Sequence, residues 1–176
     1  LVLREKQVGY GAACLRGLAH LATLPHAPDA VVVCPADGSC DPGELDRLLV
    51  PLRKRQSDLV IGSRTLGKKR LRLAARAAGY IALELIRGIY RFRYSDLSPY
   101  RAVRYPALVA MSLHDSGYGW LVAMQIRALT IGLRVSEVAV AYEEPSGRSG
   151  FADQIKRTTA AAGKVVFQIL RHSTAR

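Results

Sequence analysis

The run Ser57-Asp58-Leu59-Val60-Ile61-Gly62 has the composition of a strand that is buried on both faces of a sheet. A second apolar run, Asp29-Ala30-Val31-Val32-Val33-Cys34, precedes it and predicts another strand of the same kind. Between the two runs, Asp41-Pro42-Gly43-Glu44 supplies an N-cap, a proline at the first helical position and an acid in the first turn, which predicts a helix over 42–55. A strand, a helix and a strand in succession indicate an α/β fold.

The rest of the chain continues this alternation. Apolar spacing and flanking Gly and Pro residues predict helices over 12–24, 69–90, 105–113, 119–130 and 153–171, and strands over 99–104 and 133–142. The helix over 69–90 carries apolar residues on one face and arginines outside it, so it is predicted to be basic and amphipathic. We therefore expect one α/β sandwich domain that comprises residues 1–176.

Composition narrows the class of protein. Of the 176 residues, 49% are hydrophobic and 23% are charged, which excludes a disordered or collagen-like chain. No apolar run approaches the roughly 20 residues of a membrane-spanning helix, so we expect a soluble or membrane-peripheral protein. The three cysteines form no C-x-x-C pair, which argues for a reducing compartment and against a zinc site. The first residue is Leu1 and no signal sequence follows, so we expect an upstream segment to be missing.

Positive charge is concentrated in one segment of the chain. The formal net charge is +12, and residues 64–104 contain eleven Lys and Arg against two acids, or +9 of that total. A concentrated basic surface suits an anionic partner, which could be a phospholipid surface, a phosphorylated substrate or nucleic acid. A solvated face without a ligand is the alternative interpretation.

Candidate ligand-binding residues follow the predicted strands, because open α/β sheets bind ligands beyond the carboxyl ends of their strands. Asp37 follows the strand over 29–34, and with Asp41 it offers hard oxygen ligands to a divalent cation. The alternative is that Asp37 forms a turn and Asp41 caps a helix. Arg64 follows the strand over 57–62 and either reaches a phosphate or begins the solvated basic face. We expect Asp37 to lie at the end of a central strand, near Arg64 or Asp96.

Several motifs occur together in one order along the chain. They are Gly9-Tyr-Gly-Ala-Ala, Asp37-Gly38 with Asp41-Pro42, Asp58-Leu-Val-Ile-Gly-Ser-Arg64, Asp96-Leu-Ser-Pro-Tyr-Arg-Ala102, Tyr118-Gly-Trp120, Gly132-Leu-Arg-Val, Glu137-Val138 and Gly147-Arg148-Ser149. In this order the chain resembles the family-2 glycosyltransferases, and within them the branch similar to dolichyl-phosphate-mannose synthase. The collinear set is more specific than any single motif.

The resemblance implies a GT-A fold, an open Rossmann-like sheet with helices on both faces. It implies transfer of a sugar, with inversion, from a nucleotide-diphosphate sugar to a polyprenyl phosphate. The basic amphipathic segment over 64–104 would face this acceptor and an anionic membrane, which places the protein in the cytoplasm, peripheral to the inner face of the membrane. The family also uses a divalent cation, Mg²⁺ or Mn²⁺.

Site residues carried over from the resemblance fall into three groups. Asp96 and Arg101 match the acceptor-side catalytic motif, and Asp37 matches the second acid of the cation-binding D-x-D motif. The residues matched to the nucleotide and its diphosphate are Gly9, Gly11, Asp37, Ser39, Arg64 and Arg148.

The chain departs from the family pattern at three charged positions. Pro35 replaces the first acid of D-x-D, Ala123 replaces a carboxylate, and Gly150 replaces a lysine. The family's earlier β-α-β segment, which holds the nucleotide base and ribose, is also absent. These departures predict a weakened cation site. They leave open a non-catalytic or truncated relative that retains the fold and an anionic-lipid surface. A nucleic-acid-binding protein is a remoter alternative that rests on the charge alone.

Overall fold

The computed structural model describes residues 1–66, 73–117 and 119–143. Its strands are β1 (Ala30–Val33), β2 (Leu59–Ser63), β3 (Arg101–Arg104) and β4 (Val135–Ala139). Its helices are α1 (Tyr10–Leu21), α2 (Leu45–Arg53), α3 (Leu73–Tyr90), α4 (Tyr105–Ala110) and α5 (Gly119–Thr130), with a 3-10 turn η1 (Pro42–Glu44) before α2. The predicted helix over 153–171, Arg148 and Gly150 lie outside the described residues.

The described strands form one sheet in the order β1-β3-β2-β4. Strand β3 runs antiparallel to both of its neighbours, whereas β2 and β4 are parallel. The carboxyl ends of β1, β2 and β4 therefore meet the amino end of β3 at one edge of the sheet, which we call the carboxyl edge.

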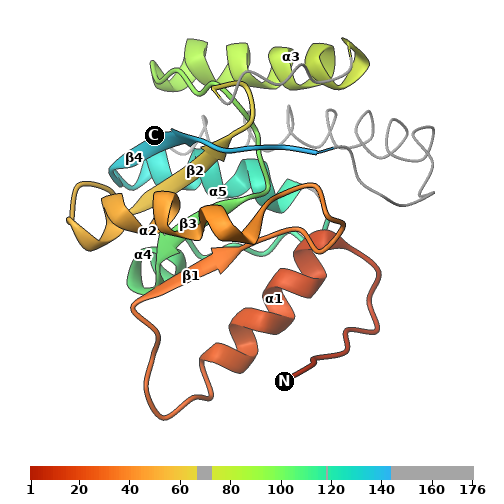
Figure 1. Cartoon of the computed structure of the whole chain (residues 1–176), viewed down its shortest axis with the longest axis vertical. Coiled ribbons are helices and arrows are strands. Elements are labelled where there is room, and N and C mark those ends of the chain that lie inside the picture. Colours follow the sequence, from red (N-terminus) through yellow and green to blue (C-terminus); the bar gives the residue numbers. More distant parts are fainter. Residues whose placement is uncertain (67–72, 118, 144–176) are drawn as a thin grey trace.

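Side-chain alternation along β2 divides the core between the two faces of the sheet. Leu59 and Ile61 pack into the larger apolar cluster, to which α3 and α5 contribute. Val60 points the other way, into a smaller cluster with Leu48 and Leu52 of α2. Helices thus cover both faces, as Figure 1 shows for α2 on one side and α5 on the other. The predicted α/β fold with helices on both faces is confirmed.

The two runs that predict doubly buried strands differ in the structure. All five residues of β2 are buried, which confirms the prediction. All four residues of β1 are only half-buried, because β1 lies at one end of the described strand order. The prediction of a doubly buried, central β1 is therefore wrong for the described sheet. Strand β4 lies at the other end of the described strand order, and all five of its residues are half-buried.

The helix predicted over 42–55 begins more tightly than expected. The Asp41 side chain accepts a hydrogen bond from the Gly43 amide at 2.8 Å, so Asp41 is the predicted cap. The cap is followed by the 3-10 turn η1, and α2 proper ends at Arg53.

The close packing of α1 explains the glycines at its start. A Cβ at Gly9 would lie 2.2 Å from the carbonyl oxygen of Ser116, and one at Gly11 would lie 2.1 Å from that of Asp115. Such distances exclude any side chain, so both positions require glycine for the approach of α1 to the segment 115–117.

Long apolar helices are not a feature of the described ranges. None of the helices there is both long enough and apolar enough to cross a membrane.

Candidate active site at the carboxyl edge of the sheet

Four segments that are distant in sequence meet at the carboxyl edge. Residues 34–41 follow β1, residues 64–66 follow β2, residues 94–100 precede β3 and residues 140–143 follow β4. The antiparallel direction of β3 brings the segment before it to the same edge as the segments after the other strands. Three of these segments carry motifs of the predicted site.

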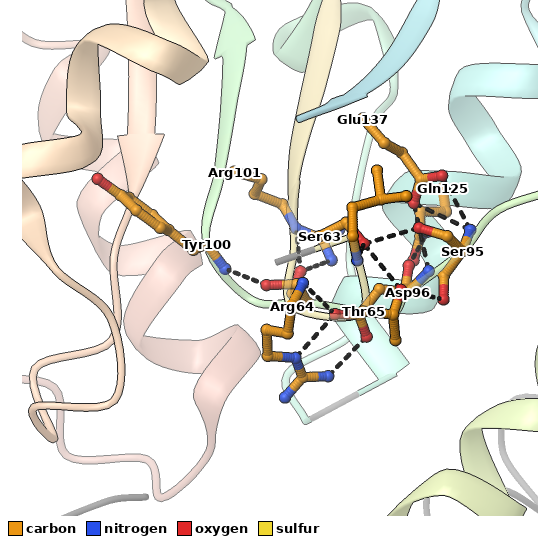
Figure 2. A network of polar contacts seen from close by, with 11 residues as sticks. Ser63, Arg64, Thr65, Ser95, Asp96, Tyr100, Arg101, Gln125 and Glu137 are labelled. Carbon is orange, nitrogen blue, oxygen red and sulfur yellow. Dashed lines mark hydrogen bonds and ion pairs between the residues drawn. The ribbon is translucent and has the colours of Figure 1, made fainter. Parts of the chain in front are cut away.

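The centre of this edge is an ion pair between Arg64 and Asp96. The Arg64 Nε donates to Asp96 Oδ2 at 2.8 Å, and a terminal guanidinium nitrogen donates to Oδ1 at 2.7 Å (Figure 2). The backbone amide of Arg64 also donates to Oδ2, at 2.9 Å. The two side chains are 17% and 4% exposed. Burial alone would lower the pKa of Arg64, but the hydrogen bonds and charge of Asp96 outweigh it and raise that pKa.

One edge of the Arg64 guanidinium is turned away from Asp96. The remaining terminal nitrogen points out of the polar network in Figure 2. The guanidinium carbon lies 5.2 Å from the ring centroid of Tyr142, a distance typical of a cation–π contact. Asp96 and Tyr142 together hold Arg64 in one orientation, with that nitrogen directed outward.

The backbone around Asp96 is held by side chains from two other elements. The Glu137 carboxylate, on β4, accepts hydrogen bonds from the amides of Ser95, at 2.8 and 3.0 Å, and Asp96, at 3.2 Å. The Gln125 side-chain nitrogen, on α5, donates to the carbonyl oxygen of Asp96 at 3.1 Å. Burial raises the pKa of Glu137, while the hydrogen bonds from Ser95 and Asp96 oppose that rise.

Hydroxyl groups complete the contacts of this segment. The Ser63 hydroxyl lies 2.7 Å from that of Ser95 and 3.0 Å from that of Thr65. The Thr65 hydroxyl donates to the carbonyl oxygen of Ser95 at 3.2 Å. The end of β2 is therefore bound to the segment before β3 by side chains as well as by the ion pair.

The sequence pattern indicates no role for Glu137, Gln125 or Ser95. Glu137 is part of a motif that supports the resemblance, and this is the signal that could have singled it out. What that acid binds depends on β4 lying beside β2, which the sequence pattern does not show.

Arg101, predicted as a catalytic residue, is completely buried. Its guanidinium donates through Nε to the carbonyl oxygen of Ser98 at 3.1 Å and through a terminal nitrogen to that of Leu121 at 2.9 Å. Burial lowers the pKa of Arg101 to about 10. The catalytic role of Arg101 stays a prediction, and in this structure its side chain has no accessible surface. Arg101 connects the start of β3 to α5.

Asp37 lies on the surface, in the turn that its own side chain stabilises. Its Oδ1 accepts the Ser39 amide at 3.0 Å, which is the turn interpretation offered by the sequence. Ser39 itself is buried, and its carbonyl oxygen accepts the amide of Glu143 at 2.9 Å. Cys40 pairs with Tyr142 in an isolated bridge. These contacts attach the Asp37 turn to the segment that carries Tyr142, and so to the Arg64 side of the edge.

Asp37 fits a divalent cation as one exposed hard-oxygen ligand. Within the described residues, no group of three His, Cys, Asp or Glu side chains could hold a metal ion. A cation at Asp37 would therefore depend on oxygens of a bound diphosphate, as Mg²⁺ commonly does in nucleotide sites.

The packing of α1 also bears on the nucleotide contacts predicted for Gly9 and Gly11. The amide of Gly11 donates to the carbonyl oxygen of Gly117 at 3.1 Å, so it is already occupied in this structure. The nucleotide contact predicted for Gly9 and Gly11 stays a prediction, since the close packing of α1 by itself accounts for both glycines. Ala123 is 5% exposed within the larger apolar cluster, on α5.

No protein-family model matches the chain. The chain is 31% identical over 147 residues to an uncharacterized glycosyltransferase of Mycobacterium tuberculosis, which covers 83% of this chain and 65% of the relative. It is 33% identical over 151 residues to an undecaprenyl-phosphate mannosyltransferase of Micrococcus luteus, which covers 80% of this chain and 59% of the relative. The chain thus spans less than two thirds of the length of these relatives.

Among solved structures, the chain matches glucosyl-3-phosphoglycerate synthase from Mycobacterium tuberculosis in complex with phosphoglyceric acid. The TM-score is 0.68 at 19% identity, over 99% of this chain and 57% of that chain. A structure of the same synthase in complex with Mn²⁺, UDP-glucose and phosphoglyceric acid matches with a TM-score of 0.61 at 18% identity, over 96% and 56%. At these identities the matches show a shared GT-A-like fold.

Proposed function

From the premise that this chain is homologous to glycosyltransferases and has their GT-A-like fold, we propose that it transfers a sugar from a nucleotide diphosphate to a polyprenyl phosphate. The Micrococcus luteus relative supports the acceptor class and suggests a mannosyl donor. The synthase complex with Mn²⁺ and UDP-glucose supports the donor class and a divalent cation.

The observation that carries this proposal is the meeting of the Asp37, Arg64 and Asp96 motifs at the carboxyl edge. Arg64 and Asp96 are 32 residues apart in sequence and bind each other directly. The Asp37 turn is attached to the segment of Tyr142, which contacts Arg64. Open α/β sheets bind ligands at this edge.

We assign Arg64 to a phosphate of the substrates. Asp96 fixes the inner edge of the guanidinium, and the outward nitrogen remains as a donor. A planar, fixed guanidinium is well suited to phosphate oxygens. Asp96 then aligns this donor, and the buried Arg101 connects the start of β3 to α5. Arg148, in the Gly-Arg-Ser motif, is proposed as a second diphosphate ligand on the resemblance alone.

The acceptor requires little help from the protein to attack. A phosphate monoester has a second pKa of about 6, so it is largely ionised at neutral pH and needs no general base. Its oxygen forms a bond to the anomeric carbon while the bond to the nucleotide diphosphate breaks, which inverts the configuration. A divalent cation held by Asp37 and the diphosphate would neutralise charge on the leaving group. A buried alanine at position 123 is compatible with this scheme.

The same proposal places the protein at the inner face of a membrane, where residues 64–104 would face an anionic surface. In the described part of this segment, Arg87, Arg91 and Arg93 are exposed near the end of α3. Tyr80 of α3 is 64% exposed. Arg87 is paired with Glu84 at 3.3 Å, whereas exposed cations and an exposed aromatic ring on one segment suit a lipid headgroup layer. Binding to anionic vesicles that weakens with salt would support this placement, and equal binding to neutral vesicles would contradict it.

The direct test is a transfer assay with labelled nucleotide-diphosphate mannose, undecaprenyl phosphate in detergent micelles and Mn²⁺. We expect a lipid-soluble labelled product whose formation stops when the cation is chelated. Pro35→Asp supplies a second carboxylate near Asp37 and is expected to increase the cation-dependent rate. Calorimetric titration with a nucleotide diphosphate and Mn²⁺ measures binding separately from turnover.

A non-catalytic relative is the second candidate, favoured by the replacement of the acid that would accompany Asp37 in the cation site by Pro35. That candidate predicts vesicle binding without transfer, even in the Pro35→Asp variant. Steep, salt-dependent binding of duplex nucleic acid with no binding of nucleotide diphosphate would instead support the third candidate.

A further inference from the structure

We propose that Glu137 is a positioning residue, which holds the amides of Ser95 and Asp96 so that the Asp96 carboxylate can fix Arg64. The consequence for catalysis rests on the proposed function, but the positioning itself can be tested without any substrate.

The carboxylate of Glu137 accepts hydrogen bonds from two consecutive backbone amides, those of Ser95 and Asp96. Its Oε1 accepts from Ser95 at 3.0 Å and from Asp96 at 3.2 Å, while Oε2 accepts from Ser95 at 2.8 Å. Among the described residues, no cation is hydrogen-bonded to it, so this half-buried acid binds a turn of the chain and not an opposite charge.

Asp96 is held at both ends of its backbone by different elements. Glu137 of β4 accepts its amide, and Gln125 of α5 donates to its carbonyl oxygen at 3.1 Å. The neighbouring Ser95 hydroxyl contacts Ser63 of β2 at 2.7 Å. With amide and carbonyl both engaged, the side chain of Asp96 is directed toward Arg64, as Figure 2 shows. Loss of the Glu137 contacts would free two consecutive amides and allow this peptide to rotate.

Two substitutions separate the effect of the length of the Glu137 side chain from the effect of its charge. Glu137→Gln retains an oxygen at the position of Oε1, which lies within hydrogen-bond distance of both amides, but it replaces Oε2, the 2.8 Å acceptor of the Ser95 amide, by a nitrogen that cannot accept. Glu137→Asp retains the charge but is one methylene shorter. If Glu137 acts by positioning, Gln should preserve the Arg64 and Asp96 pair, whereas Asp should weaken it.

The readout is hydrogen exchange of the Arg64 Nε–H by NMR in the full chain. Arg134 is the internal control, because it makes the same bidentate pair with Asp58 at the opposite end of β2. We expect Glu137→Asp to accelerate exchange at Arg64 about tenfold, the equivalent of one net hydrogen bond to a charged group, and Glu137→Gln to change it less than about twofold. Exchange at Arg134 should be the same in all three proteins.

Three results would overturn the proposal. They are unchanged Arg64 exchange in Glu137→Asp, faster exchange in Glu137→Gln than in Glu137→Asp, or a parallel change at Arg134. If Glu137→Asp does not fold, amide exchange of Ser95 and Asp96 in the unsubstituted chain decides, since rapid exchange there would exclude the hydrogen bonds. None of these measurements uses a nucleotide. Failure of the transfer assay with intact exchange results would therefore contradict the proposed function and leave the positioning role standing.

Discussion

The two ends of β2 carry the same structural unit in two different environments. At the carboxyl end, Arg64 donates to Asp96 through Nε at 2.8 Å, a terminal nitrogen at 2.7 Å and its own amide at 2.9 Å. At the amino end, Arg134 donates to Asp58 through Nε at 3.0 Å, a terminal nitrogen at 2.9 Å and its own amide at 3.1 Å. The three hydrogen bonds within each pair match atom for atom, and the remaining terminal nitrogen of Arg134 also donates to the carbonyl oxygen of Arg55.

The two pairs also differ in burial. The side chains of Arg64 and Asp96 are 17% and 4% exposed, against 56% and 18% for Arg134 and Asp58. Water screens the Arg134 pair, so it serves to attach the chain before β4 to the start of β2. The Arg64 pair is desolvated and lies at the edge where ligands bind, so its charges interact strongly with each other and with any bound phosphate. Pairing alone therefore does not identify a functional ion pair.

The largest expected difference between the two ends concerns catalysis. Arg64→Ala should reduce sugar transfer by about 10²–10³-fold, the usual cost of removing one fixed donor from a charged transition state. Arg134→Ala should leave the rate unchanged, because this side chain lies at the other end of β2. Initial rates at saturating donor and acceptor measure both. Equal losses in the two variants would mean that the assay reports stability and not the site.

Removal of each carboxylate should affect stability unequally. Asp96→Asn leaves the Arg64 charge mostly buried without an opposite charge, and we expect it to lower the free energy of unfolding by about 3 kcal/mol. Asp58→Asn leaves Arg134 in water and should cost far less. Urea denaturation followed by circular dichroism gives both values. A larger loss for Asp58→Asn would show that burial is not the property that separates the pairs.

The pH dependence of stability should have opposite signs for the acids at the two ends. The hydrogen bonds from Arg134 lower the pKa of Asp58 below 3.8, so its contribution is present above that pH and is lost as pH falls through the folded-state pKa. Burial raises the pKa of Glu137 above 4.5, so the wild type should lose stability relative to Glu137→Gln as pH rises through and above 4.5. Unfolding free energies of wild type, Asp58→Asn and Glu137→Gln across pH 3–7 test both signs. Parallel curves would contradict this assignment.

The smallest expected effect is the response to salt. The Debye length falls from about 8 Å at physiological ionic strength to about 3 Å at 1 M, which screens exposed charges first. Added KCl should therefore diminish the stability difference between wild type and Asp58→Asn, while the difference for Asp96→Asn persists. Melting temperatures at low and high salt measure this, and equal sensitivity of the two differences would refute the contrast in solvation.

Sequence patterns predicted the parts of the fold that depend on local composition. The run 57–62 predicted a buried strand because its consecutive apolar residues have no polar face to present to water, and β2 is buried throughout. The Asp41 cap was likewise readable, since capping needs only a short polar side chain next to a helix start. The order of motifs also indicated the GT-A fold, which the structural matches share.

Strand order and direction, in contrast, were decided only by the tertiary structure. Periodicity does not state which strand runs antiparallel, yet the direction of β3 is what brings Asp96 to Arg64. Burial of β1 depends on its place in the sheet, and the accessibility of Arg101 depends on α5 covering it. The role of Glu137 requires β4 to lie beside β2. Local sequence determines which residues prefer a strand, a helix or a cap, whereas long-range packing determines which charges lose their water and therefore which of two matching ion pairs belongs to the candidate site.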